Sequence, residues 1–498
     1  MISIDVLPDE VLLGIFDFCE DKVPLSPYNF CAYGSPLYAK TIIETWQSLV
    51  HVCRRWRTIV FASPRRLNLR LFCTPKTPRD ALDVWPPLPL VISDLDSRTK
   101  GVDNIVALLG HSDRVCQIEF IDIPNSRHLE KVFAATQRPF PQLTDLMLCS
   151  SSSPDETPVK RPVLPESFLG GIAPRLRKLS LDRIPFPGLP KLLLSATNLV
   201  GLHLFFIPQS GYFPPDAMLA ALTTLTNLES LHLQFKSPRS RPNQASRRPS
   251  PPTRFVLPFL SSLKFKGANE YLEVILAGID APQLSTLFIS FFTQIEFGAP
   301  KLVEFICRTP RLKELECACV TFEYDAARVE LSSRTPDYRT LNVGIICRDG
   351  NMHLSSLVQF FALSLPPLST LGYLFIYEGR CSPLEDWQDL IDITPSQWLE
   401  LLHSFAAVRH LYLSEEMAPR IGLALQEIGS RTTEILPNLE VIFLEGLEPS
   451  GLVQEDIGRF VASRQVTNHL IAVIFWDRKV EDEEYDGEDF DMDLDEDD

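Results

Sequence analysis

The sequence lacks the residue patterns that carry most enzyme and metal chemistry. It contains no H-E-x-x-H, no P-loop, no G-x-G-x-x-G and no G-x-S-x-G, so the common hydrolase, nucleotide-binding and dinucleotide-binding signatures are absent. The eleven cysteines form no C-x-x-C pair, and with the nine dispersed histidines they give no zinc-finger spacing. We therefore expect a protein that is not an enzyme and that needs neither a metal nor a cofactor.

Targeting signals and an excess of basic charge are also missing. There is no signal peptide, no apolar run of membrane length and no glycosylation sequon, which favours a soluble protein of the cytoplasm or nucleus without a membrane partner. The net charge of −17 is misleading, because 13 of the 64 acidic residues lie in Glu481–Asp498, where no basic residue occurs. The remainder has 51 acidic and 47 basic residues, so a nucleic-acid partner is not expected.

Two short amphipathic helices are predicted within the first seventy residues. The first spans about 4–16, where Pro8 suits a helix start and Asp9 and Glu10 suit the positive end of the helix dipole. The second spans about 46–60 and ends at Ser63-Pro64. Each has an apolar stripe, and a pair this small cannot bury both stripes alone. The stripes must cover either the following domain or a partner.

These segments resemble the F-box, a helical module that docks onto a Skp-type adaptor. The resemblance lies in Leu7-Pro8-x-Glu10-x-Leu12-x-x-Ile15-Phe16 and in Val52-Cys53-Arg54-Arg55-Trp56-Arg57. The continuation through Ser63–Leu69 and Trp85–Leu90 is similar to F-box proteins of mushroom-forming fungi. The sequence departs from the family in an insert of roughly 25 residues, at about 20–45, a length that a surface loop tolerates.

The resemblance implies an F-box over residues 1–70, followed by a connecting segment over 71–114. It also implies binding to a Skp-type adaptor and, through it, to a cullin. The residues that would form the adaptor surface are Leu7, Pro8, Val11, Leu12, Ile15, Phe16, Leu49, Val52, Cys53 and Trp56.

From about residue 115 the chain repeats the pattern apolar-x-x-apolar-x-apolar. Twelve copies occur, and their first positions span 324 residues in eleven steps, about 29 residues each, as in leucine-rich repeats. Several copies follow a proline, which ends the preceding helix. The first positions are Val115, Leu143, Leu176, Leu199, Leu228, Leu260, Leu284, Leu312, Tyr338, Leu371, Val408 and Leu439.

The pattern predicts a short strand in each repeat, with its leucines pointing inward at a period of two. Helical stretches such as Ala217–Leu222 and Leu272–Ala277 lie between strands, and single repeats must stack to bury their apolar faces. The expected fold class is α/β, a helical F-box followed by an irregular leucine-rich-repeat horseshoe over 115–478 that Leu470–Trp476 closes. An ordinary α/β domain with a parallel sheet is the alternative.

Two polar segments fall outside the repeat pattern. Ser237–Arg254 is rich in proline, serine and arginine, and 13 of the 20 residues in 479–498 are acidic. Both lack the apolar content that offsets the entropy of ordering, so both are expected to be disordered. A solvated insertion is the simplest interpretation of the first segment, and a nuclear-localisation or phosphorylation role is the alternative. The acidic segment is interpreted as a solubilising tail.

The residue between the last two apolar positions of each strand should point out of the array on its concave face. These residues are Met147, Ser180, His203, His232, Lys264, Phe288, Glu316, Asn342, Phe375, Tyr412 and Phe443. Four of them, Phe288, Phe375, Tyr412 and Phe443, are aromatic where a polar residue is the default for a wet strand. We expect them to bind an unidentified protein target. The alternative is that loops cover this face and the rings belong to the core.

An adaptor-docking module followed by a repeat surface resembles the substrate receptors of SCF-type (Skp–cullin–F-box) ubiquitin ligases. The resemblance implies that the F-box holds the adaptor, the repeats capture a target, and a separate conjugating enzyme performs the chemistry. The receptor would act by raising the effective concentration of target lysines. Two alternatives remain: a repeat scaffold or transport protein with no ligase role, and an enzyme with a site in the repeat concavity.

Overall fold

A computed structural model describes most of the chain. The described residues are 7–19, 45–64, 67, 69–74, 76–77, 81–84, 86–94, 102–120, 126–150, 162–237, 254–292, 299–322, 326–334, 339–346, 358, 368, 370–378, 394–427, 434–446 and 452–476. They belong to two compact units, which divide between Leu199 and Val200. Most of the predicted insert at 20–45, most of the Ser237–Arg254 segment and the whole of the acidic tail lie outside the described residues.

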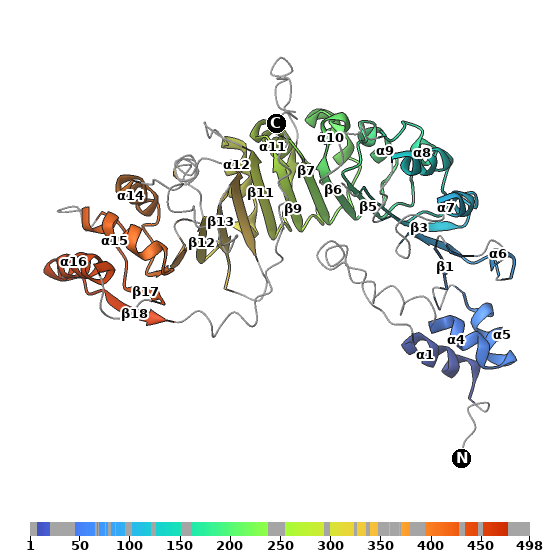
Figure 1. The fold of residues 1–498 in the computed structure, drawn as a ribbon, viewed down its shortest axis with the longest axis horizontal. Helices are drawn as coiled ribbons and strands as arrows, with labels where there is room; N and C mark the ends of the chain where they lie inside the picture. Colours follow the sequence, from blue (N-terminus) through green and yellow to red (C-terminus); the bar gives the residue numbers. More distant parts are fainter. Residues whose placement is uncertain are drawn as a thin grey trace. The chain divides into compact units, whose positions relative to one another are not determined.

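The N-terminal module contains helices α1 (Asp9–Cys19), α4 (Thr45–Val52) and α5 (Arg54–Ala62) (Figure 1). The prediction of one continuous helix over 46–60 is wrong, because the helix breaks at Cys53. The backbone of Cys53 is extended (φ −158°, ψ 170°), and its Sγ accepts a hydrogen bond from the Trp56 amide at 3.4 Å. A residue in this conformation cannot continue a helix, but it can cap the next one.

The first unit contains five parallel strands in sequence order. They are β1 (Leu71–Cys73), β2 (Leu90–Ser93), β3 (Val115–Phe120), β4 (Asp145–Cys149) and β5 (Lys178–Asp182). Helical segments follow the strands: α6 (Ala81–Val84), α7 (Val102–Leu109), α8 (Ser126–Ala135), η2 (Phe168–Gly171) and α9 (Leu189–Leu193). This alternation of strand and helix is the unit that the repeat pattern predicts.

Residues 71–114 are not the connecting segment that the sequence predicted. They form two further strand–helix units, β1 with α6 and β2 with α7. The sequence feature that could have predicted β2 is the alternation of the apolar residues Leu88, Leu90 and Ile92, all of which are buried. These strands are only three and four residues long, and they lack the spaced first leucine of the later copies.

The second unit contains most of the repeat array. Its main sheet has the strand order β6 (Gly201–Ile207), β7 (Ser230–Phe235), β9 (Ser262–Gly267), β11 (Thr286–Phe292), β14 (Thr340–Ile346), β13 (Ala326–Ser332), β12 (Cys317–Phe322), β15 (Tyr373–Glu378), β16 (His410–Leu413), β17 (Val441–Glu445) and β18 (Ala472–Trp476). A separate short sheet pairs β8 (Phe255–Val256) with β10 (Ile279–Asp280). The predicted last strand is confirmed as β18, at the end of the main sheet.

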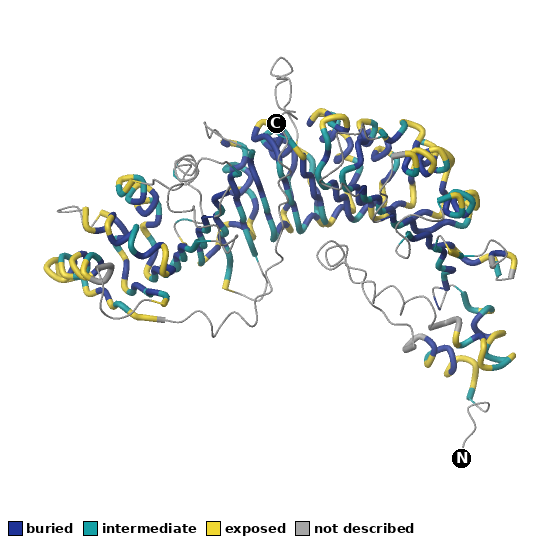
Figure 2. The backbone as a smooth tube through the Cα atoms, in the orientation of Figure 1, coloured by how far each residue is buried: buried dark blue, intermediate teal, exposed yellow. Residues whose placement is uncertain are grey.

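Helices line one face of this main sheet (Figure 1). They are η3 (Gln209–Gly211), α10 (Pro215–Leu222), α11 (Asn269–Gly278), α12 (Pro300–Arg308), η5 (Pro310–Leu312), α14 (Pro395–His403), α15 (Met417–Glu427) and α16 (Leu452–Val466). Figure 2 shows strands that are largely buried beside helices with exposed outer surfaces. The opposite face of the sheet, without these helices, is called the open face below.

Repeated leucines and repeated polar bonds hold neighbouring repeats together. The first leucines of the pattern, such as Leu228, Leu284 and Leu439, are fully buried. The side-chain amide of Asn438 donates to the carbonyl oxygen of Ala406 in the preceding repeat, at 2.9 Å. Because the same positions are buried in each copy, every repeat completes the core of the one before it.

The sheet departs from a simple array at β12, β13 and β14. β13 is antiparallel to both neighbours and reverses the spatial order of β12 and β14. The register predicted from Leu312 is also wrong. Leu312 lies in η5, and the buried sequence positions are Leu315, Ala318 and Val320.

Because the true register lies three residues later than predicted, a different residue occupies the open-face position of this strand. Glu316 precedes β12, and Cys319 takes the place in the strand that the sequence assigned to Glu316. The error has a simple cause, since Leu312 and Leu315 have the same spacing as the first two apolar positions of a true copy.

Candidate functional site

The three helices of the N-terminal module enclose a small core. Leu12 and Phe16 on α1 are buried, and the Phe16 ring lies 4.8 Å from the ring of Trp56 on α5. Val50 and Val60 are buried with them. Leu12 and Phe16, which the resemblance placed on the adaptor surface, therefore belong to the interior of the module.

An arginine fixes the start of α1 against α5. The Arg55 guanidinium donates to the Asp9 carboxylate at 2.6 Å and to the carbonyl oxygen of Leu7 at 2.5 Å. The pair is partly exposed, so its ionic energy is small, and its main effect is to set the geometry. Leu7 and Pro8 are thereby held close to the junction of α4 and α5, where Val52 and Cys53 lie.

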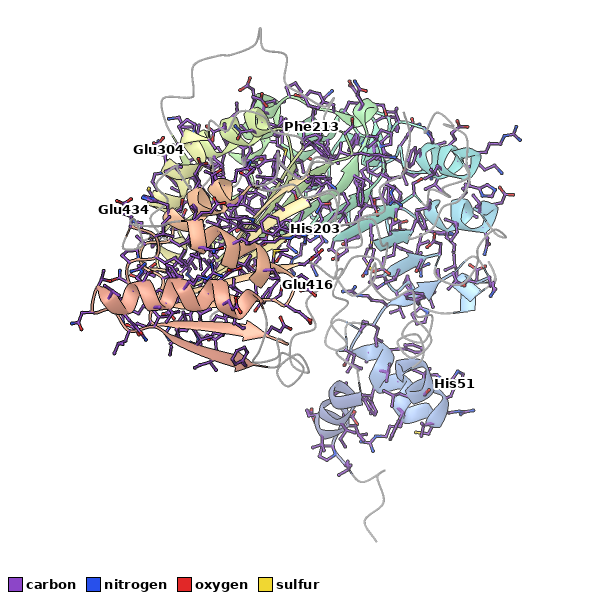
Figure 3. The ribbon with its side chains drawn as sticks, turned by 60° about the vertical axis from the view of Figure 1, so that its left-hand side comes forward. His51, His203, Phe213, Glu304, Glu416 and Glu434 are labelled. Carbon is purple, nitrogen blue, oxygen red and sulfur yellow. The ribbon has the colours of Figure 1, made fainter. Side chains whose placement is uncertain are left out.

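Several predicted adaptor residues are apolar and exposed on the module. Val11 is 44% exposed, Ile15 is 38% exposed and Val52 is 58% exposed. Pro8 is exposed as well, and the remaining four are half-buried: Leu7, Leu49, Cys53 and Trp56. Figure 3 labels His51, which lies on the same module next to Val52. These exposed apolar side chains are available for burial on a partner.

The open face of the second unit is closely packed at its first strands. His203 on β6 and His232 on β7 are neighbours in register, and their rings stack with centroids 4.3 Å apart. His203 Nε2 lies 2.8 Å from the hydroxyl of Ser230. His232 is completely buried, which lowers its pKa to about 2, with His203 and Lys264 as smaller causes. This part of the face is core rather than binding surface.

The open face is different at β15, β16 and β17, where three aromatic rings form a continuous stack. The ring of Tyr412 lies 4.2 Å from that of Phe375 and 4.2 Å from that of Phe443. The ring planes differ by 17° and 3°, and all three residues are half-buried. We call Phe375, Tyr412 and Phe443 the aromatic ladder.

A second row of side chains runs beside the aromatic ladder. Tyr373 and His410 stack with centroids 4.7 Å apart, and the Arg334 guanidinium lies 4.6 Å from the Tyr373 ring centroid. β17 pairs with β18 at the far end of the ladder, where Ile474 is in register with Phe443 and is exposed. The apolar surface thus spans four strands of the sheet.

The structure separates Phe288 from the other three predicted aromatic residues. Phe288 is in register with Lys264 and Asn342, and β14, β13 and β12 lie between its strand and β15. Cys319, which the sequence did not predict, is the neighbour of Phe375 on β12. The inserted antiparallel strands therefore decide which of the predicted residues meet.

Carboxylates gather at the carboxyl ends of the ladder strands, and the sequence reasoning did not assign them a role. Glu378 ends β15, Glu445 ends β17, and Glu415 and Glu416 follow β16. Glu416 is labelled in Figure 3. Burial raises the pKa of Glu378, and the charge of Glu416 raises it further, while Arg420 opposes both. The strand order would have predicted that these carboxylates lie together, because neighbouring parallel strands end at the same edge of a sheet.

Neither a metal-binding cluster nor a membrane-spanning helix occurs in the described part of the chain. No group of three histidine, cysteine or acidic residues there could hold a metal ion. None of the described helices is long and apolar enough to cross a membrane.

The fold and the open face define the class of the protein as an α/β repeat protein with a large, mainly parallel sheet. No family model matches the sequence, and no curated protein is similar to it. Among solved structures, the chain is similar to the leucine-rich repeat-containing protein LegL7 from Legionella pneumophila. The identity is 13%, the alignment covers 80% of this chain and 98% of that protein, and the TM-score is 0.25.

Proposed function

We propose that the chain is the substrate-recognition subunit of an SCF-type ubiquitin ligase. In this proposal the N-terminal module is an F-box that docks onto a Skp-type adaptor and, through it, onto a cullin. The repeats form a leucine-rich-type horseshoe that binds a protein target in the cytoplasm or nucleus. The chain supplies proximity, and another protein supplies the catalysis.

The observation that carries the proposal is the set of exposed apolar side chains on the N-terminal module. Val11, Ile15 and Val52 leave substantial apolar area in water although the module has a core of its own. Burying each such side chain on a partner contributes up to about 1.5–3 kcal/mol, from which the cost of association is subtracted. Ile15 and Val52 belong to the two motifs that resemble the F-box, and Val11 lies within the first of them.

The proposal is tested by co-purification with a Skp-type adaptor. Replacing Leu7 and Pro8 together by alanine should weaken adaptor binding by at least about tenfold, because two apolar contacts are lost. Thr58→Ser, at an exposed position of α5 outside both motifs, is the control and should bind normally. Unchanged co-purification of the Leu7→Ala, Pro8→Ala variant would show that the module is not an F-box.

A repeat scaffold without a ligase role is the second candidate. The open face supports it as well as it supports the ligase role, because both functions require a surface that binds a target. The two functions differ in one property, since a scaffold needs the aromatic ladder but not the adaptor surface. A chain that binds its target but no adaptor would be such a scaffold.

A further inference from the structure

The geometry of the aromatic ladder decides what kind of chemical group can bind it. Phe375, Tyr412 and Phe443 lie at matching positions on adjacent parallel strands. Since their rings are nearly parallel and only 4.2 Å apart, the ring faces cover one another along the sheet. Cys319 and Ile474 flank the two outer rings. The ladder therefore presents ring edges, rather than ring faces, on the open side.

Ring edges and ring faces attract different ligands. Nucleic-acid bases and cations bind to the electron-rich ring face, which in this ladder is turned toward the neighbouring rings. The ring edge carries a positive partial charge and prefers the face of another aromatic ring, in an edge-to-face arrangement. The half-exposed edges thus favour an aromatic side chain of a protein partner.

The charges at the end of the ladder add a second requirement. Glu415, Glu416 and Glu445 lie at this edge, whereas Glu378 is in phase with the buried Ile376 and interacts with Arg420 of α15, on the helix side of the sheet. Glu415 and Glu416 are exposed. An excess of carboxylates repels phosphate groups and attracts a lysine or arginine of a partner. Two independent features therefore point to a protein segment that is both aromatic and basic.

We propose that the aromatic ladder and the adjoining carboxylates form a binding site for an extended protein segment in which an aromatic residue lies two positions from an arginine or lysine. The spacing follows from the strands, because Glu445 is two residues beyond Phe443 on the same strand. Two residues of an extended partner span about the same distance, roughly 7 Å. This inference rests on the proposed function, since it specifies the target-binding surface of the repeats.

The test uses the full chain and four short capped peptides in one glycine–serine background. They contain Trp-Gly-Arg, Trp-Gly-Glu, Leu-Gly-Arg or Ser-Gly-Arg, and binding is measured by titration at low salt. The Trp-Gly-Arg peptide should bind at least about tenfold more tightly than the Trp-Gly-Glu and Ser-Gly-Arg peptides, with Leu-Gly-Arg between them. Equal binding of the Trp-Gly-Arg and Trp-Gly-Glu peptides, or no binding, overturns the proposal.

Two variants separate the site from the rest of the open face. Tyr412→Ser removes the middle ring, and Phe288→Ser removes a ring in the same row outside the ladder; only the first should weaken Trp-Gly-Arg binding. Because Tyr412→Ser alters packing, the exposed pair Glu415→Gln and Glu416→Gln provides a second measurement. That pair should weaken binding about tenfold at low salt and much less at high salt. A larger effect of Phe288→Ser, or tight binding of a single-stranded oligonucleotide at Tyr412, contradicts the proposal.

Adaptor co-purification with the same variants keeps the two proposals distinct. Both Tyr412→Ser and the glutamine pair should retain adaptor binding. If the adaptor binds and the peptides do not discriminate, only the ladder proposal fails. If the peptides discriminate and the adaptor does not bind, only the ligase role fails.

Discussion

The burial of His232 makes a quantitative prediction about stability in acid. In the folded chain its pKa is lowered to about 2, whereas a histidine in an unfolded chain has a pKa of about 6.5. Below that value the unfolded chain takes up a proton that the folded chain does not. The free energy of unfolding therefore falls as the pH falls from about 6.5 toward 2.

The magnitude follows from the size of the pKa shift. Each pH unit in that window removes about 1.4 kcal/mol, so lowering the pH from about 7.5 to about 4.5 costs roughly 2.7 kcal/mol at this one site. That is a large share of the roughly 5–15 kcal/mol that stabilises a domain. This cost is the same for any folded-state pKa well below about 4.5, and the complete burial of His232 between His203 and Lys264 keeps its pKa low.

The assay compares wild type with His232→Phe, which keeps an aromatic ring against His203 but cannot take up a proton. Urea unfolding is followed at both pH values by hydrogen exchange in β6, β7 and β9, because long repeat arrays can unfold in more than one step. The variant should lose about 2.7 kcal/mol less than wild type on acidification. His51→Phe, at an exposed position, is the control. Equal acid sensitivity of wild type and His232→Phe would refute the reasoning.

Three further predictions concern other parts of the chain. Deleting residues 238–253 and 481–498 should change the melting temperature by no more than about two degrees, because neither has the apolar content to contribute to a core; a larger loss in a thermal scan would show that they pack. Glu273 on α11 accepts hydrogen bonds from the amides of Lys301 and Leu302 at the start of α12, at 3.0 and 2.9 Å. Glu273→Ala should therefore cost about 1 kcal/mol and speed hydrogen exchange in α12, and unchanged exchange would contradict this. Arg55→Ala should weaken adaptor binding more than Arg54→Ala, because only Arg55 holds the start of α1; equal affinities in a titration would contradict that role.

The repeat pattern was predictable because the same positions are buried in each repeat. Leucines such as Leu263 and Leu287 occupy the same inward position in successive strands, so the requirement of the core appears directly in the sequence. The copy at Leu312 failed because a short helix and a strand can both bury leucines at that spacing. β13 has no leucine-rich signal, since it joins the sheet as a returning antiparallel strand.

The candidate sites were predictable only in part, for a related reason. Alternation along a strand identifies the open-face residues, and it correctly placed Phe375, Tyr412 and Phe443 on one face. Which of these residues meet depends on strand order, which separates Phe288 from them. In the N-terminal module, the apolar stripe includes both Phe16 and Ile15, and only the packing of Trp56 shows that the first is interior.

The most direct test of the account is the affinity of the purified full chain for a Skp-type adaptor, measured by calorimetry with surface and control variants. Wild type should bind, and Ile15→Asp with Val52→Asp should abolish binding while leaving the thermal transition of the repeats unchanged, because both side chains are exposed. The exposed control Thr58→Ser, outside both motifs, should bind as wild type does. Absence of binding by wild type, or full binding by the Ile15→Asp, Val52→Asp variant, would contradict the assignment of the N-terminal module as an adaptor-docking F-box.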